Sequence, residues 1–309
     1  SMTDLDKKYG VDRIIDTPVS ESACTGAAVG ASLAGMKPIV VQPRMDFMLY
    51  AIDAIVNQAA KWSHMFGGQA HPQVTIRGII NRGGEQGAQH SQALHAWFAH
   101  VPGLRVVMPS TVADARDLLI ASVLCKDPVV YIDDRWLYDQ EADLQPIVEI
   151  SLASQKPLIT DSGSDLTIVA SSWMNIEAKL ASEILCNEHG IQVAIFDIKS
   201  TDLTNFEQIF NSVNETGKCI VADNDWLVSG LSGEIAFHIQ KNCFRSLDLP
   251  IERIGFEQVP CPTVRELEEV FYPNAFDIVR KSEEMLGLKS CSLESYELYS
   301  HETRFKGPF

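Results

Sequence analysis

The feature that most constrains the fold is a regular alternation of short β-branched runs with helical patterns, joined by short connections. In the first half of the chain, four such runs predict buried strands at 38–42, 74–77, 104–108 and 128–132. Strands that alternate with helices in this way form a parallel sheet covered by helices on both faces. After an irregular stretch, the alternation starts again with a strand at 166–171. The sequence therefore predicts an α/β protein of two domains, each a mostly parallel sheet flanked by helices.

Apolar spacing and capping residues predict the helices. In the first domain, a helix of small residues is predicted at 23–35, and further helices at 46–65, at 91–100 and from a Ser110 or Thr111 cap to Cys125. In the second domain, the predicted elements are helices at 176–189, ended by Gly190, and at 232–242, with strands at 191–198 and 218–222.

A chain of 309 residues is long enough for two domains with separate cores. From about Tyr138 to Asp165 the sequence is polar and irregular, which predicts a linker. The predicted organisation is a first domain at 1–145, a linker at 146–165, a second domain at 166–286 and a polar tail at 287–309. Four aromatic residues of the tail are candidate anchors: Tyr296, Tyr299, Phe305 and Phe309.

Charge and composition exclude several classes of protein. The formal net charge of −16 argues against nucleic acid or an anionic membrane as a main partner, because both require a basic surface. No apolar run is long enough to span a bilayer, and the start does not resemble a secretory signal. Ser1-Met2 looks like a cloning remnant. Seven scattered cysteines without a CxxC pair indicate reduced thiols in a cytoplasmic-type compartment.

Two motifs are candidates for cofactor or metal binding. Gly83-Gly84-x-x-Gly87 follows a strand, but it lacks the G-x-G-x-x-G order of a dinucleotide site. His90, His95 and His100 are spaced by five residues, so on a helix they would lie about 140° apart rather than on one zinc-binding face. His90 differs from the other two because it lies where the glycine loop meets the predicted helix. A structural hydrogen-bonding role for His90 remains the alternative.

Glu21 is the first candidate for a catalytic group. It follows Thr17-Pro18-Val19-Ser20 and stands at the entry to the helix of small residues, which a flat ligand or a facing chain can approach closely. The helix dipole favours the ionised form of a carboxyl group at this position. The alternative is that Glu21 only complements that dipole.

The order of motifs along the chain resembles a known family. The motifs that carry the resemblance are Thr17-Pro18-Val19-Ser20-Glu21, Ala51-Ile52-Asp53-Ala54-Ile55, Gly67-Gly68, Gly87-Ala88-Gln89-His90-Ser91-Gln92 and Pro102-Gly103-Leu104. Together they resemble the beta subunit of the thiamine-diphosphate-dependent 2-oxo acid dehydrogenases, the pyruvate, branched-chain and acetoin group. The resemblance covers roughly residues 8 to 285. It implies a transketolase-like pyrimidine-binding domain followed by a transketolase C-terminal domain.

The resemblance also implies roles for individual residues. Glu21 matches the glutamate that hydrogen-bonds the aminopyrimidine of thiamine diphosphate and supports the proton relay that activates the cofactor. Phe47 matches the aromatic residue that packs on the pyrimidine, with a core role as its alternative, and Tyr50 is assigned to the same cofactor-binding segment. His90 matches the active-site histidine. Leu124 and Asp127 belong to a loop that only loosely matches the family's potassium site.

The Gly-Asp-Gly motif that holds magnesium and diphosphate in this family does not occur in the chain. The resemblance therefore implies an alpha-type partner that carries this motif and binds Mg²⁺, a second beta subunit, and a lipoyl acyltransferase core as a further partner. The expected compartment is the cytoplasm, or the mitochondrial matrix in a eukaryote. From the resemblance, we expect that an N-terminal helix and strand of some forty or fifty residues are missing here, and Arg44-Met45-Asp46 replaces a more apolar segment of the family.

Three functions follow as hypotheses. The first is oxidative decarboxylation of a 2-oxo acid with acyl transfer to a lipoyl group. The second is carbon–carbon ligation by the same cofactor, in a split transketolase or acyloin-type enzyme. The third is a catalytically incompetent assembly subunit. The particular 2-oxo acid is not determined by this chain alone, because the alpha partner shapes much of the substrate pocket.

Overall fold

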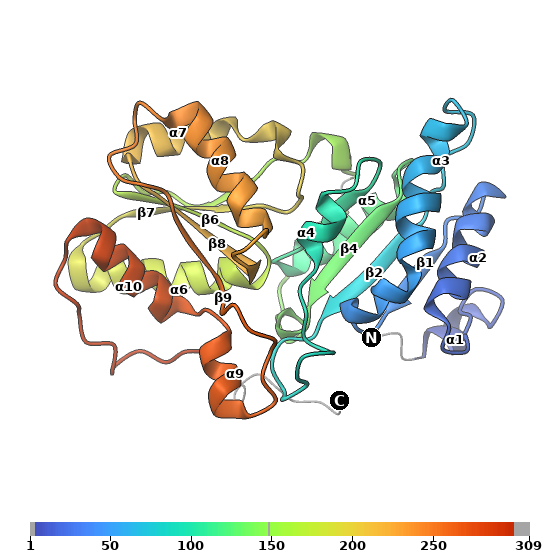
Figure 1. Cartoon of the computed structure of the whole chain (residues 1–309), viewed down its shortest axis with the longest axis horizontal. Helices are drawn as coiled ribbons and strands as arrows, with labels where there is room; N and C mark the ends of the chain where they lie inside the picture. The colour runs from blue at the N-terminus through green and yellow to red at the C-terminus, as the bar shows by residue number, and fades with distance from the viewer. Residues whose placement is uncertain (1–3, 148, 300–309) are drawn as a thin grey trace.

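The computed structural model describes residues 4–147 and 149–299 and contains two α/β units side by side (Figure 1). The first sheet has four parallel strands in the order β1-β2-β4-β3. The second has five strands in the order β5-β7-β6-β8-β9, all parallel to their neighbours except β5. The predicted α/β class with two mostly parallel sheets is confirmed.

The elements of the first unit are α1 (Leu5–Tyr9), α2 (Glu21–Leu33), β1 (Ile39–Gln42), the 3₁₀ segment η1 (Met45–Ala51), the π segment η2 (Asp53–Ala59), α3 (Ala60–Met65), β2 (Thr75–Ile80), α4 (His95–Ala99), β3 (Arg105–Val107), α5 (Val112–Leu124), β4 (Val129–Asp134) and η3 (Arg135–Leu137). Every residue of β4 is buried, as expected of a strand between β2 and β3 with helices on both faces. The Thr111 hydroxyl caps α5 by accepting a hydrogen bond from Asp114 N at 3.1 Å, which confirms that predicted cap.

The elements of the second unit are η4 (Leu152–Ser154), β5 (Leu158–Asp161), β6 (Leu166–Ala170), α6 (Trp173–His189), β7 (Val193–Asp197), η5 (Leu203–Asn205), α7 (Glu207–Thr216), β8 (Cys219–Trp226), α8 (Leu231–Cys243), β9 (Glu252–Phe256), α9 (Arg265–Phe271) and α10 (Ala275–Leu286). The helix α6 ends at Gly190, whose φ of 70° is the left-handed conformation that glycine adopts most easily.

Part of the predicted linker is a strand. β5 pairs antiparallel with β7 and forms an edge of the second sheet, although its residues are half-buried or exposed. Because half of its surface faces solvent, β5 lacks the continuous apolar run by which the buried strands were found. The sequence pattern likewise did not identify β9, α7, α9 and α10. The domain boundaries themselves stay predictions.

Two predicted helices are interrupted. Over 46–65 the chain forms a 3₁₀ segment, then a π segment, then the short helix α3. Over 91–100 only His95–Ala99 is helical. The reason lies in contacts between the two regions: Gln92 N donates to Asp46 Oδ1, and Leu94 N donates to Met45 Sδ at 3.2 Å. These amides donate to the other segment instead of to carbonyl groups of a preceding helical turn, and α4 begins only at His95.

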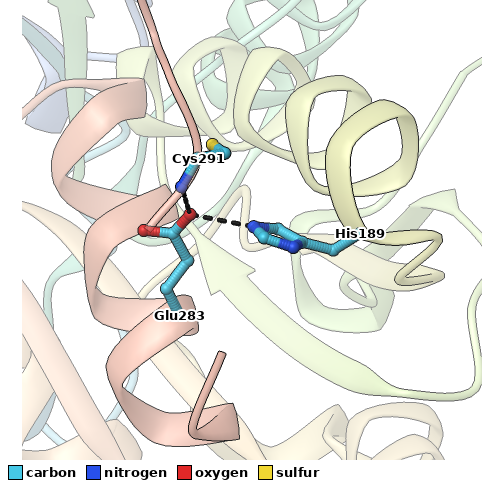
Figure 2. A group of neighbouring side chains, drawn as sticks. All are labelled: His189, Glu283 and Cys291. Carbon is cyan, nitrogen blue, oxygen red and sulfur yellow. Dashed lines mark hydrogen bonds and ion pairs between the residues drawn. The ribbon is translucent and has the colours of Figure 1, made fainter. Parts of the chain in front are cut away.

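Residues 287–299, the described part of the predicted tail, pack against the second unit. Leu293, Tyr296 and Leu298 lie against the core between α6 and α10, and the Tyr299 ring contacts Trp173 with centroids 5.5 Å apart. Phe305 and Phe309 lie outside the described residues. Figure 2 shows how Glu283 of α10 fastens this segment: one carboxylate oxygen accepts from Cys291 N at 2.8 Å and from His189 Nε2 at 2.9 Å. The other oxygen accepts from Arg280 at 2.7 Å.

Because of these donors, the contribution of Glu283 to the stability of the fold depends on pH. Burial opposes ionisation, but the hydrogen bonds from Cys291, His189 and Arg280 lower the pKa of Glu283 to about 2. A pKa below the unfolded value means that the stabilisation is present above about pH 4.5 and is lost as pH falls toward 2. We expect Glu283→Gln to lower the free energy of unfolding at pH 7 by at most about 3 kcal/mol. In urea titrations, this deficit should shrink below pH 3; Glu284→Gln, an exposed neighbour, is the control and should change little.

Candidate active site

The candidate site lies along the edge of the first sheet where its parallel strands end. In parallel α/β sheets, ligands bind at this carboxyl edge, because the loops that leave the strands converge there. The segment η1 follows β1, and the loop 81–94 follows β2. The neighbouring strands β1 and β2 are in register from Ile39 opposite Thr75 to Gln42 opposite Gly78, so both segments leave the sheet side by side.

Glu21 is the first residue of α2, and α2 begins at the same edge. Gln42, the last residue of β1, donates through Nε2 to the hydroxyl of Thr25 at 3.4 Å, and Thr25 lies one helical turn after Glu21. The Glu21 side chain is half-buried, and within the described residues it makes no hydrogen bond or ion pair. Its carboxylate is therefore available to a group from outside this chain.

Phe47 and His90 are brought into direct contact. Their ring centroids are 5.4 Å apart and the rings meet edge to face at 87°. Both side chains are half-buried. The turn before His90 depends on Gly87, whose φ is +70° and where an added Cβ would lie 2.7 Å from the Thr263 hydroxyl. Figure 1 shows α2 on the side of the first unit that is remote from the second sheet.

Two other predicted residues lie in different surroundings. Tyr50 is 72% exposed on the outer surface of η1, so its assignment to cofactor binding stays a prediction. Leu124 is the last, exposed residue of α5, and the carboxylate of Asp127 accepts from Arg105 Nε at 2.8 Å. An arginine therefore already provides the positive charge at this loop, and a potassium ion would have to compete with it.

Asp46 and Gln92 are site residues that occur in segments named from the sequence, but neither was assigned a role there. Asp46 is 5% exposed and directly precedes Phe47; its Oδ1 accepts from both the backbone N and the Nε2 of Gln92, at 3.2 and 2.9 Å. Burial raises the pKa of Asp46, while the hydrogen bonds from Gln92 and the charge of His90 oppose this. The available signal was a polar residue close in sequence to each candidate ring, Asp46 near Phe47 and Gln92 near His90. The sequence does not reveal that these two residues, 46 positions apart, form hydrogen bonds with each other.

A cavity of about 270 Å³ lies beside this loop, between the two units. Ala88 and Gln92 form one wall, and Trp226, Gln258, Val259 and Pro260 of the second unit form the other. Ala88 and Gln92 each lie two residues from His90 in sequence, so the cavity borders the loop that carries the histidine.

Buried charges join the loop to the second unit. His95 Nε2 lies 3.1 Å from Asp223 Oδ1 and 3.8 Å from Asp225 Oδ2, and all three residues are buried. Burial alone would lower the pKa of His95, but the two carboxylates raise it to about 9. Burial and the neighbouring Asp223 also raise the pKa of Asp225 to about 6, against the charge of His95.

A second polar group lies in the same interface. Arg82, buried after β2, donates to Asn224 Oδ1, and Asn224 donates through Nδ2 to Asp134 Oδ2 at 2.8 Å. Arg82 Nε lies 3.5 Å from the same Asp134 oxygen. The two sheets are further tied by an antiparallel bridge between Val107 and Ser200. The second unit therefore supports the loop that carries His90.

Potential metal ligands converge at two places in the described part of the chain: His95 with Asp223 and Asp225, and His189 with Glu283 and Cys291. Both groups are already held by hydrogen bonds within the protein. Neither includes Glu21, Phe47 or His90. At the carboxyl edge, Glu21, Phe47 and His90 offer a carboxylate and two aromatic rings, a set that fits an aromatic nitrogen base. All seven cysteines are free, and no described helix is long and apolar enough to cross a membrane.

Comparison with known proteins agrees with this geometry. Residues 2–140 match the family model "Transketolase, pyrimidine binding domain", and residues 155–278 match "Transketolase, C-terminal domain". A solved structure, "Split gene transketolase, inactive beta4 tetramer", has the same fold, with a TM-score of 0.73 at 21% identity over 94% of this chain and 89% of that one. The pairing of domains is thus that of the transketolase-like, thiamine-diphosphate-dependent enzymes.

Curated relatives narrow the assignment. "Pyruvate dehydrogenase E1 component subunit beta-1, mitochondrial" of Oryza sativa subsp. japonica is 37% identical over 88% of this chain and 74% of the relative. "Acetoin:2,6-dichlorophenolindophenol oxidoreductase subunit beta" of Cupriavidus necator is 36% identical over 88% of this chain and 79% of the relative. The chain belongs to the family of beta subunits of the thiamine-diphosphate-dependent 2-oxo acid dehydrogenases, which confirms the resemblance.

Proposed function

We propose that this chain is the pyrimidine-binding half of a thiamine-diphosphate site and acts in oxidative decarboxylation of a 2-oxo acid with acyl transfer to a lipoyl group. The observation that carries the proposal is the half-buried Glu21 carboxylate, which makes no hydrogen bond or ion pair within the described residues and stands at the same sheet edge as the Phe47–His90 pair. Family membership supports the reaction class.

Each residue has a distinct task in this proposal. Bound thiamine diphosphate supplies a carbon nucleophile for the 2-oxo group and accepts the electron pair released on decarboxylation. Glu21, at the start of α2 where the helix dipole favours negative charge, would accept a hydrogen bond from a protonated ring nitrogen of the pyrimidine. Phe47 provides an apolar wall for the pyrimidine. His90 holds or donates a proton at the substrate oxygen, in contact with the Phe47 ring.

The proposal requires a partner that covers Glu21 and grips the diphosphate. The surface beside Glu21 supports this, because Val19, two residues earlier, is a large apolar side chain that is 93% exposed. On α2, a Cβ added at Gly26 or Gly30 would meet nothing within 4 Å, so another chain can approach closely. We assign this face to an alpha-type chain with Gly-Asp-Gly and Mg²⁺. A second beta subunit, an acyltransferase core and the cytoplasmic or mitochondrial compartment remain predictions.

Reconstitution tests the reaction. The chain is mixed with an alpha-type chain, thiamine diphosphate and Mg²⁺, and reduction of an artificial electron acceptor is followed with a panel of 2-oxo acids and acetoin. Turnover of a 2-oxo acid without any added aldehyde supports the proposal. An absolute requirement for an aldehyde or ketose acceptor would support carbon–carbon ligation instead, and absence of cofactor binding with the cognate partner would support an assembly role.

A further inference from the structure

The segment that carries His90 has little secondary structure of its own. His90 N donates to Gly87 O at 3.3 Å, and the helix α4 begins only at His95. Three consecutive residues of η1 contact this segment instead: Met45 Sδ accepts from Leu94 N, Asp46 accepts from Gln92, and Phe47 meets His90. The position of the His90 ring therefore depends on η1.

Asp46 makes the polar part of this contact. Its Oδ1 binds both the backbone N and the side-chain Nε2 of Gln92, so one oxygen fixes the peptide and the rotamer of Gln92 together. Two hydrogen bonds to a charged oxygen are stronger than the neutral ones an amide would offer. Gln92 is two residues from His90, and Ser91, the residue between them, is buried.

The second carboxylate oxygen of Asp46, Oδ2, has no structural role that packing explains. Asp46 Oδ2 is buried and has no hydrogen-bond partner in the described structure. A buried carboxylate with an unpaired oxygen costs free energy, and an apolar side chain could fill the same volume more cheaply. A charged group kept at such a cost, next to a candidate active site, indicates a role in that site.

We infer that Asp46 is a positioning residue for His90, which acts by holding Gln92 and so sets the edge-to-face placement of the His90 ring against Phe47. The expected effect of Asp46 on turnover rests on the proposed function, because His90 is a catalytic residue only in that proposal. The contact itself is a property of this chain alone.

The contact is tested first without cofactor or partner. In the ¹³C- and ¹⁵N-labelled full chain, the ring signals of His90 are assigned by comparison with His90→Ala. Asp46→Ala should shift these signals, because the ring moves relative to Phe47, and should leave the signals of His238 in place. Asp46→Asn keeps an acceptor oxygen for both Gln92 groups and should preserve them. The half-buried Asp117, paired with Arg116 on α5, provides the control Asp117→Ala. Unchanged His90 signals in a folded Asp46→Ala protein would overturn the inference.

The consequence is tested in the reconstituted complex. Asp46→Ala should lower kcat about 10- to 100-fold with little change in KM, because a misplaced catalytic group costs about this much. In a His90→Ala background, the same substitution should cost less than about twofold, since coupled residues are non-additive. Equal losses in both backgrounds would mean a purely structural role for Asp46 and contradict the inference. If Asp46→Ala does not fold, Gln92→Ala replaces it with the same expected results. A wild-type complex without turnover would contradict the proposed function, while the histidine signals still decide the contact.

Discussion

Glu21→Ala is expected to lower the turnover of 2-oxo acids by the reconstituted complex about 1,000-fold, within the range that general acid–base groups contribute. The side chain stands at the start of α2 and makes no hydrogen bond or ion pair within the described residues, so its removal breaks no internal contact. The measurement is kcat with an artificial electron acceptor, together with the size of the complex by light scattering. Loss of activity without loss of assembly is the expected combination.

The matched control for this prediction is Glu207→Ala. Glu207 is also the first residue of a helix, α7, and is exposed in the second unit. Both substitutions remove a negative charge from a helix N-terminus, so any effect of the helix dipole alone should appear equally in both. If Glu21→Ala retained more than about a tenth of wild-type kcat, far above the loss expected of a proton-relay group, the role assigned to Glu21 would be wrong.

His95→Ala is expected to give the largest loss of stability, about 3–5 kcal/mol. The substitution leaves Asp223 and Asp225 buried without their cation, and breaking a buried ion pair on one side costs this amount. Unfolding in urea, followed by tryptophan fluorescence, measures the loss. His100→Ala, an exposed histidine of the same segment, should lie within about 0.5 kcal/mol of the wild type.

The same contact predicts a dependence on alkaline pH. The pKa of His95 is raised from 6.5 to about 9, so its stabilisation is fully present below pH 6.5 and is lost as pH rises through about 9. The free energy of unfolding of the wild type should therefore fall between pH 7 and pH 9.5, and His95→Ala should remove most of that decline. An identical decline in both proteins would show that other groups cause it.

Much of the architecture was predictable because its strands are buried on both faces. β4 and β6 are buried along their whole length, and the neighbouring helices α5 and α6 carry clear signals, the Thr111 cap and Gly190. The edge strand β5 was not predictable in the same way, since one side of it faces solvent. The interrupted helix after His90 was also missed. Its cause is a contact between Asp46 and Gln92, and apolar spacing carries no information about such a contact.

The candidate site shows the same division. Glu21 and His90 were predicted from local motifs. The structure places Phe47 against His90, because η1, which carries Phe47, follows directly after β1. The contact of His95 with Asp223 spans 128 positions and joins two domains, so spacing in the sequence could not reveal it. In the structure, the stretch Asp223-Asn224-Asp225 of β8 receives the buried cations His95 and Arg82.

In the proposed complex, this chain supplies only the pyrimidine-binding half of a cofactor site, and another chain binds the diphosphate. Isothermal titration of thiamine diphosphate with Mg²⁺ tests this claim directly, using this chain alone, an alpha-type chain with Gly-Asp-Gly alone, and their mixture. The account predicts stoichiometric binding by the mixture only, weakened by Glu21→Ala and unaffected by Glu207→Ala. Tight binding by this chain alone, or binding by the mixture that ignores Glu21, would contradict it.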